Sequence, residues 1–243
     1  SESVGVGFAG TGVLFGLIVA DNGSFLSNSG NREAIAMAID RPRLLTSFDI
    51  VWRETLTLAP ETIRNREPIE RPEWMASNIA DRKNLALTTI AKWESGNGTV
   101  RPLRIALPAG SGARLFFAML SVDFADIGLE VVRVGINDPA DLRLIDRPAD
   151  MSGHSWYLSQ FSCNASPICS EHADKLLSEA RDAPDAATRA KLLAEAETEL
   201  QRLRNFIPIS LPLRWSVARQ GLLGFAINRR GLHPLQYLGR DPT

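Results

Sequence analysis

Residues 103–134 read LRIALPAGSGARLFFAMLSVDFADIGLEVVRV, and this stretch decides the fold class. Residues 103–107 predict a strand, residues 113–127 a helix with Gly128 at its C-terminal cap, and residues 129–134 a second strand. A strand, a helix and a strand at this spacing form a βαβ unit, whose strands are parallel and whose crossover is right-handed. We therefore expect an α/β protein.

The segments before this unit alternate between predicted secondary structure and irregular chain. Residues 13–20 are apolar with Gly16 among them and predict a buried strand. Asn31 is expected to cap a short helix over residues 32–40, which Pro42 must end or kink. Residues 49–78 carry several prolines without sustained periodicity and predict an irregular surface excursion, followed by a helix over residues 81–95.

The segments after the unit complete the predicted sheet and its covering helices. Residues 138–146 are interpreted as a short helix and residues 149–157 as a further strand. Two amphipathic helices follow, the second capped by Asp185, and strands are expected over residues 207–213 and 215–218. The whole predicts a mixed sheet with βαβ units flanked by helices, plus antiparallel strands from the N- and C-terminal segments.

Length and charge limit the possible partners. The chain has 243 residues, with 27 Lys and Arg against 28 Asp and Glu, so its net charge is -1. A neutral balance gives no general attraction to nucleic acid or to an anionic membrane, and no nucleic-acid partner is expected. The sequence contains no run of 18 apolar residues, so it predicts no membrane span. Residues 13–20 are not interpreted as a signal peptide. The chain enters an apolar pattern already at Val4, which suggests a piece of a longer protein.

Two glycine motifs raise the possibility of nucleotide binding. Gly5–Gly10 fits G-x-G-x-x-G, but a dinucleotide site needs a strand before the motif and a helix after it. Here a strand follows, which favours a glycine-rich turn or strand entry. Gly110-Ser111-Gly112 lies between a strand and a helix N-terminus, where backbone amides could hold an anion. It lacks a third glycine, and a tight βα turn explains it more simply.

Catalytic and metal chemistry find little support. His154, His172 and His233 are far apart in sequence and form no metal-binding pattern, so no metal and no cofactor are expected. Neither a nucleophile elbow nor a phosphate-binding loop is present, and we expect no enzyme. Cys163 and Cys169 flank a turn-prone stretch and could close a small disulfide ring or remain free thiols.

Aromatic and polar residues after residue 149 are the candidates for ligand contact. Trp156 with Tyr157 ends the expected strand, and crevices form at the carboxyl ends of strands in α/β sheets. A half-buried packing role for Trp156 is the alternative.

The order of these segments resembles the extracellular solute-binding proteins of peptide-type ABC transporters, family 5, which include dipeptide, oligopeptide and nickel-binding proteins. Residues 32–41, REAIAMAIDR, resemble that family's R-x-A-x-x-x-A-I-D-R, and residues 127–131, IGLEV, its iGi-x-v. Ala149-Asp150 followed by Trp156 is similar to its yD…gW strand. Further matches are residues 172–177 (HADKLL) with evDaLi, 189–196 with R-x-x-l-x-x-x-a, 207–209 (IPI) with iPl, and Gly224-Phe225 with its closing G-f.

The resemblance implies a domain and a set of partners. Residues 1–243 would form the C-terminal lobe, called domain III, of a two-lobed periplasmic binding protein whose N-terminal lobe is absent here. The implied partners are that lobe, an inner-membrane ABC permease and a small-molecule or peptide ligand.

The resemblance also implies the ligand contacts. Trp156 would wall the site, with Ser155, Ser159 and His154 as hydrogen-bonding candidates and Asp150 shaping the strand. Peptide binders carry an Asp at the position of Ser159, opposite the peptide's amino group, so a free-amine peptide is in doubt. A periplasmic location would favour the disulfide. The alternatives are a small α/β nucleotide-binding enzyme using Gly110–Gly112, and an interaction domain with no small ligand.

Overall fold

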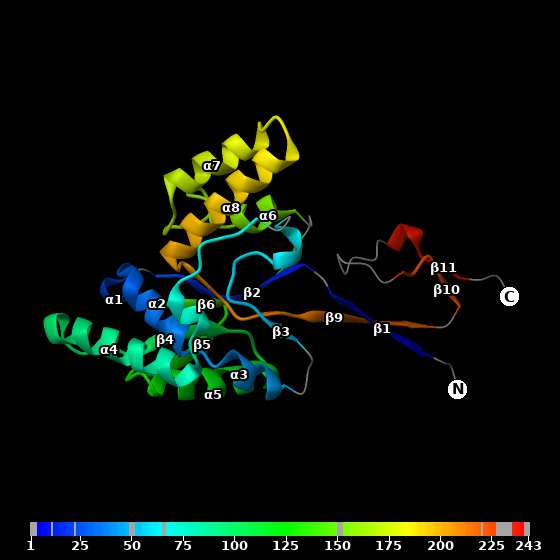
Figure 1. Cartoon of the computed structure of the whole chain (residues 1–243). Coiled ribbons are helices and arrows are strands. Elements are labelled where there is room, and N and C mark those ends of the chain that lie inside the picture. The colour runs from blue at the N-terminus through cyan, green and yellow to red at the C-terminus, as the bar shows by residue number, and fades with distance from the viewer. Residues whose placement is uncertain are drawn as a thin grey trace.

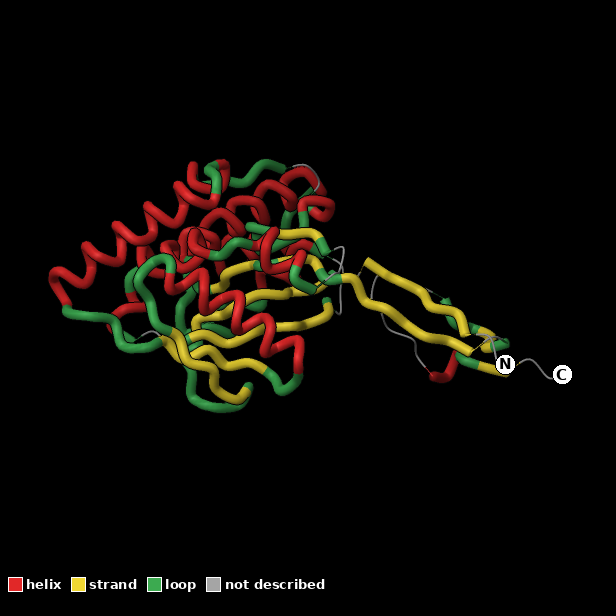
Figure 2. Tube along the Cα trace, turned by 90° about the horizontal axis from the view of Figure 1, so that it is seen from below, coloured by secondary structure: helices red, strands yellow, loops and turns green. Residues whose placement is uncertain are grey.

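The computed structural model describes residues 4–10, 12–21, 23–48, 52–64, 67–149, 153–219, 221–226 and 235–240. These residues form a body of helices around one sheet and a narrow two-stranded arm that projects from the body (Figure 1, Figure 2). No helix in this described part is long and apolar enough to cross a membrane.

The body is built on a five-stranded sheet in the order β5-β4-β6-β2-β7. Strand β4 runs parallel to β5 and to β6, whereas β2 runs antiparallel to β6 and to β7. The mixed sheet and the parallel βαβ unit expected from the sequence are thus confirmed. The strands are β2 (Val13–Val19), β4 (Leu103–Leu107), β5 (Val131–Gly135), β6 (Leu142–Pro148) and β7 (Phe206–Pro208).

Helices cover both faces of this sheet (Figure 1). One layer holds the first helices of the chain together with the βαβ crossover, and the other holds the last three. The first layer contains α1 (Ser24–Ser27), α2 (Ser29–Ala38), α3 (Arg41–Thr46), α4 (Ile79–Asn97) and α5 (Ser111–Ala125). The second contains α6 (His154–Ser159), α7 (Glu171–Arg181) and α8 (Ala186–Leu203).

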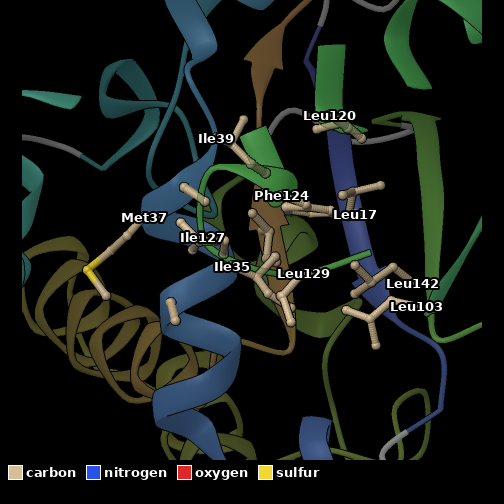
Figure 3. Close-up of a cluster of buried hydrophobic side chains, with 14 of the residues drawn as sticks. Leu17, Ile35, Met37, Ile39, Leu103, Leu120, Phe124, Ile127, Leu129 and Leu142 are labelled. Atoms are coloured by element: carbon tan, nitrogen blue, oxygen red, sulfur yellow. The ribbon is translucent and has the colours of Figure 1, made fainter. Parts of the chain in front are cut away.

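The alternation of side chains along β2 divides the core into two parts, because successive residues of a strand point to opposite faces. Leu17 and Val19 belong to the larger buried cluster under α2 and α5, and Leu14 to the cluster under α6–α8. Figure 3 shows the larger cluster, where Leu17, Ile35 and Phe124 converge from β2, α2 and α5. Both sheet faces are therefore sealed, as a sheet with parallel strands requires.

The segment REAIAMAIDR owes its pattern to two buried arginines. Arg32 donates hydrogen bonds to the carbonyl oxygens of Leu203 and Leu26, at 2.7 and 2.6 Å. Arg41, only 1% exposed, donates to the carbonyl oxygen of Pro208 at 2.8 Å. These hydrogen bonds join α2 to the last residue of α8 and α3 to β7, so the motif has a structural role.

Gly16 lets the edge strand β7 approach β2. A Cβ atom at this position would lie 2.3 Å from the carbonyl oxygen of Ile207, a distance that no real Cβ contact shows. Glycine is required here because another backbone passes close to it.

The arm consists of β1 (Val4–Gly10) and β9 (Leu213–Arg219), paired antiparallel from Val4 opposite Arg219 to Gly10 opposite Leu213. Gly5–Gly10 therefore lies within a strand, which rules out the strand-to-helix turn of a dinucleotide site and agrees with a strand entry. The start of β1 lies at the far end of the arm (Figure 1). The short elements there are β10 (Leu222–Leu223), η3 (Leu235–Tyr237) and β11 (Gly239–Arg240).

Two predictions after residue 137 are wrong. Residues 138–146 are not a helix, because strand β6 occupies Leu142–Pro148 and inserts between β4 and β2. Residues 149–157 are not a strand, because helix α6 begins at His154. The segment forms a helix because its buried residues recur at helical spacings of 3, 4 and 7. These residues are His154, Tyr157, Leu158 and Phe161. Asp150 and His233 lie outside the described residues.

Earlier in the chain, α2 is capped by Asn28 rather than by Asn31. Asn31 is buried instead and donates from its side chain to the carbonyl oxygen of Phe25. The helix ends at Ala38, and Pro42 stands in the first turn of α3.

The excursion over residues 49–78 is irregular, but it is not wholly on the surface. Its described regular elements are β3 (Arg53–Glu54), which pairs with β8 (Ser210–Leu211), and the turns η1 (Glu61–Ile63) and η2 (Glu73–Ala76). Ala59 and Arg64 are buried, and the Ala59 amide donates to the carboxylate of Glu197 on α8. The hydrogen bond to this buried carboxylate holds the middle of the excursion against the body.

Candidate functional site

Helix α6 lies at the end of the body from which the arm projects (Figure 1), and two cavities open beside it. The larger of the two has a volume of about 460 Å³. A volume of this size falls within the range of ligand pockets, about 300–1,000 Å³. It is lined by Ser155, Trp156, Ser159, Ser162, Asn164, Asp174, Leu177 and Arg181.

Three of the four residues expected to contact a ligand meet in this cavity. Trp156 is half-buried and packs edge-on against Tyr157, with ring centroids 5.0 Å apart. Ser155 is half-buried and Ser159 exposed, and the Ser159 hydroxyl donates to the carbonyl oxygen of Trp156 at 2.9 Å. The helix therefore presents one aromatic ring and two hydroxyl groups to the same hollow.

His154 does not join them. Its ring is buried, and Nε2 lies 2.7 Å from Oε2 of Glu197, which is itself fully buried. The Nε of Arg64 lies 2.9 Å from the same oxygen. His154 thus lies in a buried charged cluster that ties α6 to α8 and to the excursion. It lines the second cavity rather than the larger one.

Tyr157 anchors α6 on its buried side. It is 1% exposed, and burial raises the pKa of its phenol to about 12, although a hydrogen bond with the Val13 backbone acts in the opposite direction. The phenol therefore stays protonated at physiological pH. The Tyr157 ring, which contacts Trp156, packs between α6 and β2.

The loop between α6 and α7 supplies the rest of the wall. Cys163 and Cys169 are joined as a disulfide, with Cα atoms 5.0 Å apart, a separation usual for such bonds. The Cys163 amide donates to Oδ2 of Asp174 at 2.9 Å. The disulfide and this hydrogen bond fix the loop that carries Ser162 and Asn164.

Asp174 and Arg181 are functional candidates that the sequence reasoning missed. They stand with Leu177 on one face of α7, at spacings of three and seven residues that a helical projection would have grouped. The Oδ1 atom of Asp174 is buried and has no hydrogen-bond partner among the described residues. The cavity therefore contains a carboxylate and a guanidinium as well as hydroxyl groups.

The remaining sequence candidates are explained by local structure. Gly110 caps α5 with a φ of 120°, a conformation that requires glycine, so the turn itself accounts for the motif Gly110–Gly112. Among the described residues no group of three His, Cys, Asp or Glu side chains is placed to hold a metal ion. His172 is exposed in the first turn of α7.

No family model matches the chain, and no curated protein matches it by sequence. Solved structures do match. The chain is similar to Haemophilus influenzae OppA in complex with the peptide RPPGFSPFR, at 17% identity and a TM-score of 0.84, covering 97% of this chain and 50% of OppA. It is similar to the Escherichia coli murein tripeptide binding protein MppA, at 15% identity and a TM-score of 0.84, covering 97% and 49%.

A third neighbour binds a different kind of molecule. The chain is similar to AgaA of A. tumefaciens R10 in complex with agropinic acid, at 16% identity and a TM-score of 0.78, covering 100% of this chain and 53% of AgaA. The chain spans about half the length of the solved structures it matches. The resemblance to the family 5 solute-binding proteins is confirmed at the level of the fold, and the chain has the fold of one half of such a protein.

Proposed function

We propose that this chain is the C-terminal, solute-binding lobe of a periplasmic binding protein that serves an ABC importer. It would close with an N-terminal lobe around a small polar solute and deliver that solute to a membrane permease. The observation that carries the proposal is the cavity of about 460 Å³ at α6, where Trp156, Ser155 and Ser159 face one hollow. No bond is made or broken in this activity, since selectivity rests on a few polar groups and on closure.

The arm supports the two-lobe arrangement. A ribbon of two antiparallel strands leaves the body, as Figure 2 shows, and it carries the chain away from the sheet. Two strands that connect lobes form a hinge, because a few residues can absorb the rotation that closes a cleft. A second lobe at the far end of the arm would face the cavity at α6.

The side chains of the cavity favour a solute with both acidic and hydrogen-bonding groups. Arg181 offers a cation, Asp174 a carboxylate, and the serines offer hydroxyl groups that donate or accept. Trp156 offers a ring face for stacking on a flat or apolar part of the solute. Opines and short peptides both fit this description. Because position 159 is Ser, the amino group of a peptide would have to pair with the carboxylate of Asp174.

Chemical-shift mapping tests the proposal. The ¹⁵N-labelled protein is titrated in turn with agropinic acid, with Met-Leu and with NAD⁺. We expect one of the first two to shift the amide signals of Ser155, Trp156, Ser159 and Ser162, and we expect Trp156→Ala to remove the response. Tyr237→Ala, which removes an aromatic side chain that is 69% exposed on the arm, serves as the matched control. Shifts at Gly110–Gly112 with NAD⁺, or no response at α6 to either solute, would contradict the proposal.

A further inference from the structure

The second cavity beside α6 has a volume of about 320 Å³ and lies between η1, the start of α6 and the start of α8. Its polar side chains are Arg64, His154 and Arg189, and its apolar walls include Ile63 and Leu193. None of its lining residues is acidic. The side chains that reach this cavity are therefore mainly hydrogen-bond donors.

Arg64 lines this cavity, and most of its guanidinium is bonded within the protein. Its side chain is 3% exposed, and its Nη2 donates to the hydroxyl of Thr57 at 2.6 Å and to the carbonyl oxygen of Ala59 at 2.7 Å. Nε lies 2.9 Å from Glu197 Oε2, so this side of the guanidinium is held in an ion pair, and no partner for Nη1 is present among the described residues. Nη1 is therefore the nitrogen of Arg64 that remains available to a bound acceptor.

The charged side chains that line the cavity are both cationic. Glu197 lies beneath the wall and balances Arg64, so the pair is neutral together. Arg189 stands exposed on the first turn of α8, and no side-chain partner for it is present in the described part of the chain. Asp185 precedes α8 but does not line the cavity, and its carboxylate accepts hydrogen bonds from the amide and hydroxyl of Thr188. Glu61, the nearest acid on η1, lies in an ion pair with Arg71.

We propose that this cavity binds the carboxylate group of a small organic acid. The carboxylate would accept hydrogen bonds from Arg64 and Arg189, and the short apolar part of the acid would pack against Ile63 and Leu193. A guanidinium matches a carboxylate with two parallel hydrogen bonds, which favours this group over a lone halide ion. The site stands apart from the cavity of Trp156, on the other side of α6, and does not depend on the proposed function.

The test compares three probes on the whole chain at equal ionic strength: sodium hexanoate, hexylammonium chloride and sodium phosphate. Amide chemical shifts are followed by NMR. We expect saturable shifts at Gly153, His154, Ala186 and Ala190 with hexanoate, and weak or no response with the other two. Equal binding of hexylammonium would show a purely apolar site, and stronger binding of phosphate would show an inorganic anion site. Either result overturns the proposal.

Two pairs of variants locate the site without disturbing the buried cluster. Arg189→Gln should weaken hexanoate binding about tenfold or more, the usual effect of losing a charge-assisted hydrogen bond. Arg114→Gln, the same change on an exposed arginine of α5, should leave it unchanged. Ala186→Phe fills the cavity mouth and should block binding, whereas Ala187→Phe, the adjacent exposed residue, should not. Unchanged affinity in both Arg189→Gln and Ala186→Phe, or shifts centred on Trp156, would overturn the assignment.

Discussion

At the scale of single residues, glycines and buried carboxylates fix positions that hydrophobic packing alone leaves free. Gly16 is required by the backbone of β7, which would meet any Cβ atom at 2.3 Å. Asp141, 2% exposed, accepts hydrogen bonds from Arg101 Nη2 at 2.6 Å and from the Arg104 amide at 2.7 Å. Gly16 thus allows β7 to pair closely with β2, and Asp141 ties the start of β6 to β4.

Gly16→Ala should lower the free energy of unfolding by about 1–3 kcal/mol, because the added methyl group forces β2 and β7 apart. Gly96→Ala is the matched control. Gly96 lies near the end of α4 with nothing within 4 Å of an added Cβ atom, so its replacement should stabilise the protein by about 0.5–1 kcal/mol. Urea denaturation of both variants measures the difference, and equal effects would contradict the close approach of the strands.

Asp141 makes the stability depend on acidic pH. Burial alone would raise its pKa, but hydrogen bonds from Arg101 and Arg104 hold the pKa below its usual value of 3.8. The unfolded chain therefore takes up the proton more readily than the folded one, and the stability contributed at neutral pH is lost as the pH falls below about 4. Asp141→Asn should destabilise the protein at pH 7 by about 2 kcal/mol and flatten its acid dependence.

The matched control for that experiment is Asp182→Asn, whose carboxylate is exposed at the end of α7. Its free energy of unfolding, measured by urea denaturation from pH 7 to pH 2.5, should follow the wild type. An unaltered acid dependence in Asp141→Asn would show that other carboxylates govern it.

At the scale of elements, α6 depends on what lies beneath it. Glu197 is fully buried and contacts His154, Arg64 and the Ala59 amide, so one carboxylate joins three segments. Removing one partner of a buried ion pair leaves the other charge uncompensated. Loss of the Glu197 carboxylate should therefore loosen both α6 and the excursion.

Glu197→Ala should destabilise the protein by about 3–5 kcal/mol, since Arg64 would remain buried without its counter-ion. Glu195→Ala is the control on the same helix. Its carboxylate is half exposed and lies 4.0 Å from Lys191, so its removal should change stability by about 0.5 kcal/mol or less. Guanidinium denaturation measures both, and a small effect at Glu197 would mean that the cluster is not what holds α6.

The disulfide between Cys163 and Cys169 fixes the loop that follows α6. Titration of the denatured, unreduced protein with a thiol reagent should detect no free thiol. The double variant Cys163→Ser with Cys169→Ser should lose about 2 kcal/mol, the value that a ring of this length gives in the chain-entropy model. Two reactive thiols before reduction would contradict the bond.

Local pattern was enough for the elements whose periodicity is complete. The βαβ unit and the cap of α8 at Asp185 follow from apolar spacing and capping chemistry, and the structure confirms them. Strand β6 was not predicted, because its arginines and aspartate interrupt the alternation of apolar and polar residues. Its place between β4 and β2 depends on pairing with strands that are distant in the sequence. Of the candidate cavity, the sequence pointed to Trp156, Ser155 and Ser159, whose role in binding stays a prediction, whereas Asp174 and Arg181 reach the cavity only through tertiary packing.

At the scale of the whole molecule, the body and the arm have different roles. The body has a sealed sheet and two helical layers, while the arm extends from one side of the body (Figure 2). A cleft between two lobes buries its ligand from both sides, so one lobe alone supplies only part of the contacts. The central claim of a solute-binding half therefore predicts weak binding by this chain alone.

Isothermal titration of the chain with the solute that shifts the α6 signals tests this claim most directly. We expect a dissociation constant of about 1 mM or weaker, equivalent to about 4 kcal/mol, and a further loss in Trp156→Ala. A dissociation constant below about 1 μM for the chain alone would contradict the account, because the site would then be complete without a second lobe.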